Sequence, residues 1–489
     1  MMKWICITLS ALTVTACAMF VPQDRPNTPI SLPAAYSLYT DGDPAPDRWW
    51  ESFGSDALNR LVETALAGNF DVRTAWARLK QADAVARQAG ANRMPMLDGS
   101  GGAEKSWQQT KTDAAGTSHS NSRTFSAGLV AAYELDLWGR LAALQQSENL
   151  ALKASAEDLA AAAVTVSAEV TTAWIEILSL HRQIAILRDQ IDINQRMLKL
   201  QELRFVNGQA DALDISQQRE ALAQAKAKLP PLQLAEQQQQ NALAVLLGRA
   251  GAGDFTVNQE TLPSLIPLPA TGLPADLLAA RPDIRAAGLR LKAADWQVSA
   301  ARTDRLPSIT LSADAAFSSD TLDLLLGNWV STLAASLTGP VFDAGYRSAE
   351  VDRTRAVADE YLTAYAQTVA GAIQEVEDSL ATETRQGEYI VLLEEQLKAS
   401  RLTLKDAHLQ YMNGQDNYLA YLTAWTSVQA LERQLVDEKA TLIKNRVSLY
   451  RTLGGDWTRG LMAGGVPAPA TDTNTETVPQ TQTNTVKNG

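Results

Sequence analysis

Histidines, cysteines and clustered carboxylates supply most catalytic and metal-binding chemistry, and this chain places few of them together. The 489 residues contain three histidines, His119, His181 and His408, which lie far apart. None has a second ligand-type residue at the spacing typical of a zinc site. No Gly-x-Ser-x-Gly or phosphate-loop pattern stands between a strand and a helix. The sequence therefore predicts neither an enzyme nor a bound metal or cofactor.

One cysteine does have a defined chemistry. A short, mostly apolar run at 4–13 is an export signal too short to span a bilayer as a helix. The sequence Val-Thr-Ala-Cys at 14–17 resembles the lipobox of bacterial lipoproteins, which implies a covalent lipid on Cys17. Cys6 would be removed with the signal, which leaves no internal disulfide. Ala18, where an aspartate often marks inner-membrane retention, favours the outer membrane. The alternative is an ordinary signal peptide with an incidental cysteine.

Two Asn-Gly pairs with related surroundings are the next candidates. They close the segments 204–208 and 410–414, and Asn-Gly is favourable turn chemistry in any helical hairpin. The candidate tip residues are Arg204, Phe205, Asn207, Gly208, Tyr411, Asn413 and Gly414.

The elements that position these tips are long and repeated. Gly139 to Gly208 and Gly345 to Gly414 each span 69 residues at an offset of 206, which indicates an internal duplication. The first span contains no internal glycine or proline, and a helix of that length would extend roughly 96 Å. Apolar residues repeat every seven positions in both spans, as in a coiled-coil seam. The first seam has two rows: Ala163, Val170, Ile177, Ile184, Ile191, Leu198 and Phe205; then Leu159, Val166, Ala173, Leu180 and Leu187. In the second span only Glu383 breaks the matching row.

Shorter elements flank each long helix. Residues 55–91 are predicted to form one helix, and Pro230-Pro231 should kink or break the helix that returns from the first tip. The segment 125–135 alternates apolar and small or polar residues, which is typical of a strand with two different faces. A weaker strand is predicted at 95–110, with a polar loop at 110–122, and two further strands at 308–317 and 329–337.

Four amphipathic strands cannot close a membrane barrel, because open edges would leave backbone groups unpaired in lipid. Known barrels begin at eight strands. Cyclic symmetry would join the edges of neighbouring copies. Three chains would supply twelve strands.

Three stretches, at 273–287, 414–419 and 449–457, resemble the outer-membrane efflux family of TolC-like channels, and most closely its lipoprotein branch. The resemblance covers residues 17 to about 460. It implies a mainly α fold with a membrane β-barrel: a tandem-duplicated long α-helical barrel plus four strands per chain, which form a 12-stranded barrel in a homotrimer. It also implies an outer-membrane location, with tips that meet a periplasmic adaptor and, through it, an inner-membrane pump of the resistance-nodulation-division or ABC type.

The expected organisation has six parts. They are a signal peptide at 1–16, a lipid-anchored extended segment at 17–54, a first repeat at 55–249, a linker at 250–272, a second repeat at 273–457 and a disordered tail at 458–489.

Some family members close the periplasmic mouth with aspartates six and nine residues after the second tip glycine. Here those positions hold Ala420 and Thr423, so the sequence departs from the acidic pattern at both. Asp416 and Tyr418 are the other candidates for a constriction, together with Tyr411 and Tyr421.

The predicted function is passive conduction of drugs or other small molecules after loading by the pump and adaptor. The net charge of −12 argues against a nucleic-acid partner. Two alternatives stay open. One is a type I protein-secretion exit duct with the same fold. The other, less favoured, is a periplasmic adaptor lipoprotein, which would usually carry one hairpin rather than two copies with membrane strands.

Overall fold

The computed structural model describes residues 21–22, 30–38, 46–112, 116–251, 261–265, 267–270, 272 and 274–458. The signal peptide, Cys17 and the tail after residue 458, which was expected to be disordered, lie outside the described residues.

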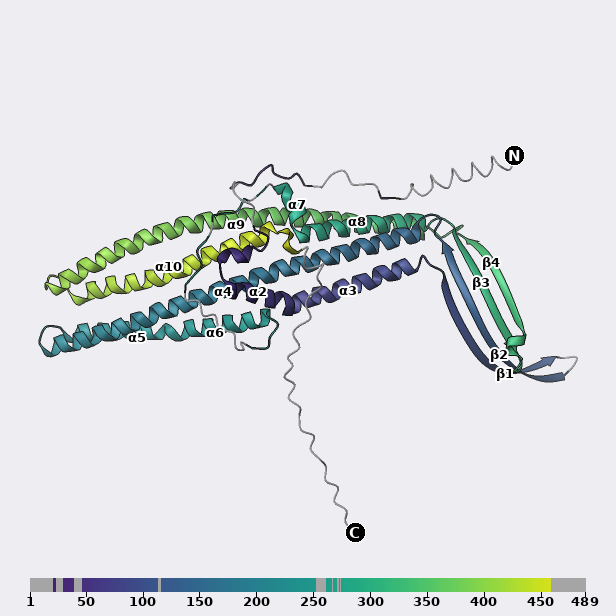
Figure 1. The fold of residues 1–489 in the computed structure, drawn as a ribbon, viewed down its shortest axis with the longest axis horizontal. Coiled ribbons are helices and arrows are strands. Elements are labelled where there is room, and N and C mark those ends of the chain that lie inside the picture. Colours follow the sequence, from purple (N-terminus) through teal and green to yellow (C-terminus); the bar gives the residue numbers. More distant parts are fainter. Residues whose placement is uncertain are drawn as a thin grey trace, which may run out of the picture.

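Two long helices determine the shape of the molecule. α4 (Arg140–Val206) and α9 (Tyr346–Met412) each contain 67 residues. Both begin at the sheet and end at the opposite extreme of the molecule (Figure 1), about 100 Å away for straight helices of this length. The predicted duplication of one long helix is therefore confirmed.

Returning helices complete two hairpins. α10 (Tyr418–Leu453) packs along α9. α5 (Ala212–Ala227) and α6 (Leu229–Leu246) pack along α4. The predicted break at the proline pair is confirmed, because both prolines lie in the first turn of α6. There the missing backbone N–H groups are tolerated.

The sheet-proximal halves of the long helices pack against a second set of helices. These are α2 (Asp56–Gly68), α3 (Phe70–Ala91), α7 (Leu277–Ala280) and α8 (Pro282–Thr303). α8 lies between α4 and α9. Four short 3₁₀ segments complete the described helical structure: η1 (Trp49–Phe53), η2 (Pro274–Asp276), η3 (Leu325–Gly327) and η4 (Asp456–Thr458).

The prediction of one helix over 55–91 was wrong, because the chain breaks at Asn69. The Asn69 side-chain oxygen accepts hydrogen bonds from the backbone N–H groups of Asp71 (2.8 Å) and Val72 (3.3 Å) and so starts α3. Its side-chain nitrogen donates to the carbonyl of Leu246 at 2.9 Å. The break thus ties the junction of α2 and α3 to the end of the first hairpin.

The four strands form one antiparallel sheet in the order β1-β2-β3-β4. They are β1 (Met96–Thr112), β2 (Gly116–Leu135), β3 (Ser308–Ser319) and β4 (Trp329–Thr338). The prediction of a loop at 110–122 was wrong, because β1 and β2 stay paired as far as Thr112 and Gly116. The polar composition of this segment indicates exposure to water rather than absence of backbone pairing. The hydroxyl of Ser122 even forms a cross-strand hydrogen bond of 2.7 Å with the hydroxyl of Ser106.

All three strand pairings run without a bulge, so side chains of one parity share one face of the sheet. The odd-numbered face of the four-stranded part is apolar: Leu97, Phe125, Leu129, Tyr133, Leu311, Phe317, Trp329, Leu333 and Leu337. The even-numbered face carries Asp98, Ser126, Glu134, Thr310, Asp314 and Thr332. Within the described chain β1 and β4 each have one unpaired edge, so further copies are needed to close the sheet.

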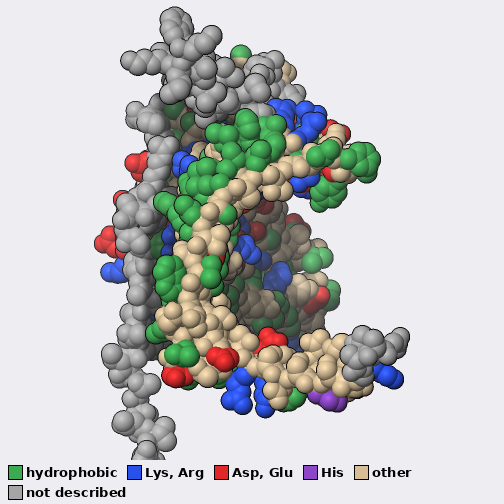
Figure 2. All heavy atoms as spheres, turned by 90° about the vertical axis from the view of Figure 1, so that its right-hand side faces the viewer, with side chains coloured by type: hydrophobic (Ala, Val, Ile, Leu, Met, Phe, Trp, Pro, Cys, Tyr) green, Lys and Arg blue, Asp and Glu red, His purple; other side chains and the backbone are tan. Residues whose placement is uncertain are grey.

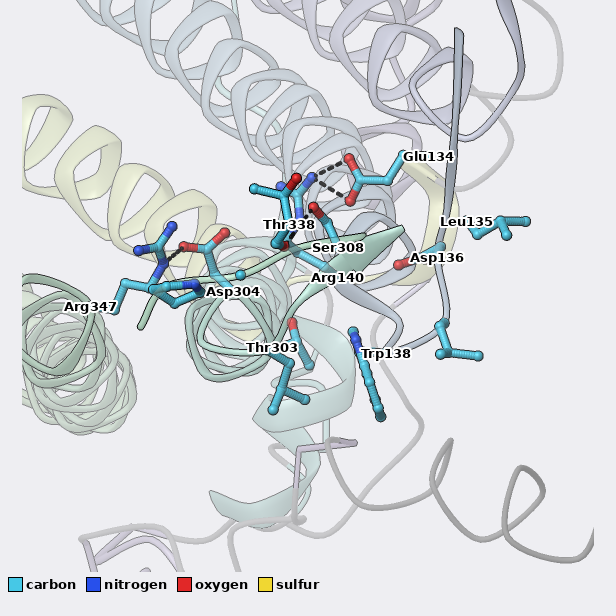
Figure 3. A pocket seen from close by; sticks show the side chains of 14 residues that line it. Glu134, Leu135, Asp136, Trp138, Arg140, Thr303, Asp304, Ser308, Thr338 and Arg347 are labelled. Atoms are coloured by element: carbon cyan, nitrogen blue, oxygen red, sulfur yellow. Dashed lines mark hydrogen bonds and ion pairs between the residues drawn. The ribbon is translucent and has the colours of Figure 1, made fainter. Parts of the chain in front are cut away.

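Charged side chains form hydrogen bonds at both junctions between the sheet and a long helix (Figure 3). The carboxylate of Asp136 accepts hydrogen bonds from the N–H groups of Leu141 (3.0 Å) and Ala142 (2.7 Å), where it also complements the helix dipole. Arg140 then turns back to bond Glu134 at 2.8 and 2.9 Å. In the second repeat Arg347 bonds Asp304 at 3.0 Å. Hydrogen bonds therefore tie the start of α4 to the end of β2, and the start of α9 to the end of α8.

A large buried cluster with several aromatic side chains lies midway along the hairpins. Trp49 stacks on Tyr450 with ring centroids 5.4 Å apart, and Trp50 meets Trp457 edge-on at 4.8 Å. In the middle of α4 the side chains of the predicted heptad seam are buried, including Val170 and Ile177. Towards the tip it fails at Phe205, which is exposed because the hairpin ends there.

Glu383, the residue that breaks the second seam, is buried beside Arg446 of α10, with exposed side-chain fractions of 6% and 5%. The two form a multiply bonded ion pair. Arg446 also donates to the carbonyl of Pro267 at 3.2 Å, so the pair fastens part of the segment between the repeats to the second hairpin.

Candidate functional site

The two tips have the same backbone geometry. Gly208 has φ +70° and Gly414 has φ +68°. In the first tip Gly208 N–H donates to Phe205 O and Gln209 N–H to Arg204 O. In the second, Gly414 and Gln415 make the corresponding bonds to Tyr411 and Gln410. These paired bonds are the Schellman helix ending, which requires a left-handed residue and so favours glycine.

The space around both tip glycines is open. A Cβ atom added to Gly208 or Gly414 would meet nothing within 4 Å. Backbone conformation, not packing within the chain, therefore requires glycine. Apolar side chains nearby are unusually exposed, such as Val206 (81%) and Met412 (58%). An exposed apolar end on two helical hairpins is a surface on which a helical partner could pack.

The tip residues predicted from the sequence divide into two groups. Asn207, Gly208, Asn413, Gly414 and Phe205 are exposed. Arg204 and Tyr411 are half-buried because they contact each other, with the guanidinium carbon 4.6 Å from the ring centroid. Since Arg204 belongs to α4 and Tyr411 to α9, this cation–π contact joins the two hairpins.

Behind the tips, three tyrosines form a compact cluster between the hairpins. The ring centroids of Tyr411 and Tyr418 are 5.3 Å apart, and those of Tyr418 and Tyr421 are 5.9 Å apart. Tyr418 is only 2% exposed. Its hydroxyl donates to the side-chain oxygen of Gln218 on α5 at 2.5 Å. Burial raises the pKa of Tyr418, so the hydroxyl stays protonated and remains a donor.

Amide side chains of the first hairpin accept hydrogen bonds from aromatic side chains of the second hairpin. Gln201 accepts a hydrogen bond from Tyr411 at 3.1 Å, and Asn194 accepts one from Trp425 at 3.2 Å. Further from the tip Gln190 donates to the carbonyl of Gln429 at 3.0 Å. Gln190, Asn194, Gln201 and Gln218 are all buried. The hairpins are therefore joined near the tips by a polar and aromatic contact rather than by an apolar seam.

Sequence reasoning missed these amides. Asn194 and Gln201 continue the second heptad row beyond Leu187 at the same spacing of seven. The change from apolar to amide within a regular row was the available signal. Buried amide groups need hydrogen-bond partners, so a row of them indicates polar side chains or backbone groups on the element packed opposite.

The remaining residues considered for a constriction do not cluster. Asp416 is exposed, and its carboxylate accepts the N–H of Asn417 at 2.7 Å. Asn417, not Asp416, caps α10 by accepting the N–H of Ala420 at 3.1 Å. The Thr423 hydroxyl is exposed and donates to the carbonyl of Leu419. Of the four candidates, Tyr418 alone has its side chain fixed between the hairpins.

Among the described residues there is no group of three or more histidine, cysteine or acidic side chains that could hold a metal ion. His181 instead bonds Glu236 at 2.8 Å across the first hairpin.

A sheet with one apolar face, joined to paired helical hairpins about 100 Å long, defines an outer-membrane channel of the helical-barrel and β-barrel type. The sequence pattern of the family described as "Outer membrane efflux protein" matches residues 61–249 and 273–455. The chain belongs to that family.

Curated relatives share nearly the whole chain. "Pyoverdine export outer membrane protein OpmQ" of Pseudomonas putida is 31% identical over 93% of this chain and 98% of that protein. "Cation efflux system protein CusC" of Escherichia coli O157:H7 is 30% identical over 91% of this chain and 97% of that protein. The family is named for outer-membrane efflux, OpmQ for export at the outer membrane and CusC for cation efflux. This chain is an outer-membrane efflux channel.

Solved structures agree in fold. The outer-membrane channel OprN superposes with a TM-score of 0.81 at 28% identity, covering 90% of this chain and 100% of that one. VceC of Vibrio cholerae gives 0.77 at 27% identity, with 84% and 100% covered. The predicted fold class is thereby confirmed, including its division into a helical barrel and a β-barrel.

Proposed function

We propose that three copies of this chain form a passive exit duct for drugs or other small molecules, loaded by a periplasmic adaptor and an inner-membrane pump. One observation carries the proposal: each long helix starts at a strand of the membrane sheet and ends, about 100 Å further on, at an exposed turn. Such a unit can connect the outer membrane with proteins deep in the periplasm. Nucleic acid has no place in this function.

The adaptor would bind the two tips. Phe205, Val206 and Met412 offer apolar surface, while Asn207 and Asn413 offer exposed amides. Adaptors that end in helical hairpins could pack into the grooves between these tips. The pump would be of the resistance-nodulation-division or ABC type.

The contact between the hairpins would hold the periplasmic mouth closed. Arg204–Tyr411 and Tyr418–Gln218 both join the first hairpin to the second. Separation of the hairpins would break both contacts and widen the passage. Adaptor binding at the tips could supply the free energy for that separation, because it acts on the same short segments. Asp416, Ala420 and Thr423 would then lie beside the gate without forming an acidic ring.

The cargo would be chosen mainly by the pump. The relatives are named for pyoverdine export, cation efflux and toluene efflux, which are chemically unlike cargoes. We assign the chain no catalytic activity and no cofactor other than a covalent lipid on Cys17.

The docking role of the tips can be tested by replacing Gly208 or Gly414 with valine. A β-branched residue is strained at positive φ and would place a side chain in the open docking space. We expect either variant to lose drug resistance in cells that depend on this channel, while heat-sensitive trimers still form in the outer membrane.

Gly54 provides a matched control for this test. It also ends a helical segment at positive φ (+64°) with open space around it, but it lies near the middle of the molecule. Gly54→Val carries the same backbone strain and should keep resistance. Full resistance in both tip variants would refute the docking role.

A further inference from the structure

The first strand pair extends well beyond the rest of the sheet. β2 pairs with β3 only from Leu135 to Phe125. Beyond that point residues 104–112 and 116–124 pair only with each other, and we call this two-stranded extension the arm. Nine residues per strand extend about 30 Å. Figure 1 shows the arm projecting at the end of the sheet opposite the helices.

The position of the sheet in the membrane determines on which side of the membrane the arm lies. The part of β2 that pairs with β3 has eleven residues, which is enough for a tilted strand to cross a bilayer. The helices occupy the periplasmic side, so the arm stands on the cell exterior. Its first residue pairs lie at the head groups of the outer leaflet.

The two faces of the arm differ in charge. The register has no bulge, so the odd-numbered side chains of the arm continue the apolar, lipid-facing side of the sheet. This outward face carries Lys105, Trp107, Lys111, His119 and Arg123. Across the described side chains at 104–111 and 117–124, its odd-numbered positions include no acid, and Glu104 faces the other way. Asp113 lies outside the described residues. Figure 2 shows basic and histidine side chains gathered along this projection.

Two of the cations are direct neighbours. Lys105 is the cross-strand partner of Arg123, and both point to the outward face. Like charges directly opposite each other destabilise a strand pair. Neither has an acidic partner among the residues that the structure describes; Lys105 instead lies 4.9 Å from the ring centroid of Trp107. Trp107 itself is 71% exposed. An anion bound between the two cations would remove the repulsion.

We propose that the outward face of the arm binds the phosphate groups of lipopolysaccharide, the anionic glycolipid of the outer leaflet. Arg123 can bind a phosphate through two N–H groups, and Lys105 adds a point charge beside it. Trp107 is suited to the boundary between acyl chains and head groups. Lys111 and His119 lie further out, at the level of the phosphorylated sugars. The proposal requires only that the sheet lies in the outer membrane; it does not depend on the adaptor, the pump or the cargo.

The test uses the purified full-length trimer and lipid A as the probe. Binding would be measured in detergent for bisphosphorylated lipid A, for its dephosphorylated form and for phosphatidylglycerol, at low and high salt. We expect the parent trimer to prefer bisphosphorylated lipid A, with binding that weakens as salt rises. The variant Lys105→Gln/Arg123→Gln should bind it at least about tenfold more weakly, since each basic residue near an anionic surface contributes about 1 kcal/mol.

A control removes equal charge elsewhere. Lys398→Gln/Lys405→Gln lies on the exposed surface of α9 and should bind lipid A like the parent. Heat-sensitive migration as a trimer shows that each variant is folded. Parent-like affinity in the folded arm variant would overturn the proposal. Equal binding of phosphatidylglycerol and lipid A by the parent would also overturn it, because the site would not distinguish lipopolysaccharide. Drug resistance, measured in the same strains, reports on the channel function independently.

Discussion

At the scale of single residues, buried polar groups decide how the two hairpins hold each other. Tyr418 reaches across to Gln218, and Tyr411 to Gln201. A buried hydrogen bond stabilises modestly when made, but its loss leaves the partner unsatisfied. Contacts of this kind suit a gate better than an apolar seam, because an opened gate lets water replace the lost partners.

Replacement of Tyr418 by phenylalanine tests this gate. The ring would stay, but the hydrogen bond to Gln218 would be lost, which should weaken the closed state by about 1 kcal/mol, or about fivefold in the opening equilibrium. We expect a higher single-channel conductance in planar bilayers. Tyr389→Phe is the control, because it removes an exposed hydroxyl that accepts a bond from Gln434 within the second hairpin. Equal conductance in the two variants would exclude Tyr418 from the gate.

At the scale of elements, the parity of each strand decides which side chains meet lipid. Leu333 on β4 is 85% exposed in the isolated chain and lies on the apolar face. Its neighbour Thr332 lies on the polar face beside Asp314, its cross-strand partner. The same strand therefore has a lipid side and a water side, one residue apart.

Arginine scanning distinguishes the two sides of β4. Leu333→Arg places a charge in the lipid and should destabilise the barrel by about 2–4 kcal/mol near the bilayer midplane. Trimers of this variant should dissociate at a lower temperature on gels. Thr332→Arg should leave the dissociation temperature near that of the parent, since its side chain would face the water-filled lumen next to a carboxylate. If Thr332→Arg proved the more damaging change, the assignment of the faces would be wrong.

At the scale of the whole molecule, the proposed lipid on Cys17 requires an N-terminal segment long enough to reach from the middle of the helical hairpins to the membrane. Tyr36 is buried, and the Ser37 N–H donates to Glu377 of α9 at 2.8 Å. Glu377 lies 31 residues after Tyr346, about 46 Å along the helix from the sheet. Ser37 lies 20 positions after Cys17, and a chain of that length can span at most about 70 Å. A lipid on Cys17 would therefore reach the inner leaflet of the outer membrane while Tyr36 stays in place.

Lipid attachment can be tested with the two cysteines. Cys17→Ser should abolish incorporation of labelled palmitate, whereas Cys6→Ser, in the predicted signal peptide, should leave it unchanged. Trimers should still form in the Cys17 variant, because the strands close the barrel without the lipid. Undiminished labelling of Cys17→Ser would show that the lipobox assignment is wrong.

The sequence by itself determined the large-scale plan. The period of 206 residues, the two Asn-Gly turns and the alternation at 125–135 are local or repetitive signals. They predict long helices, tight turns and two-faced strands because helix and strand periods follow from backbone geometry alone.

Only the tertiary structure decided which polar residues meet. Asn194, Gln201 and Gln218 are unremarkable amides in the sequence, and Glu383 looks like a defect in a heptad. Their partners Trp425, Tyr411, Tyr418 and Arg446 lie 63 to 231 residues away. The break at Asn69 and the length of the arm were likewise missed. The amide of Asn69 also bonds the distant carbonyl of Leu246, whereas the arm is a local hairpin whose polar composition indicated a loop. A buried polar side chain is explained only by what lies opposite it, and that is fixed when the hairpins pack together.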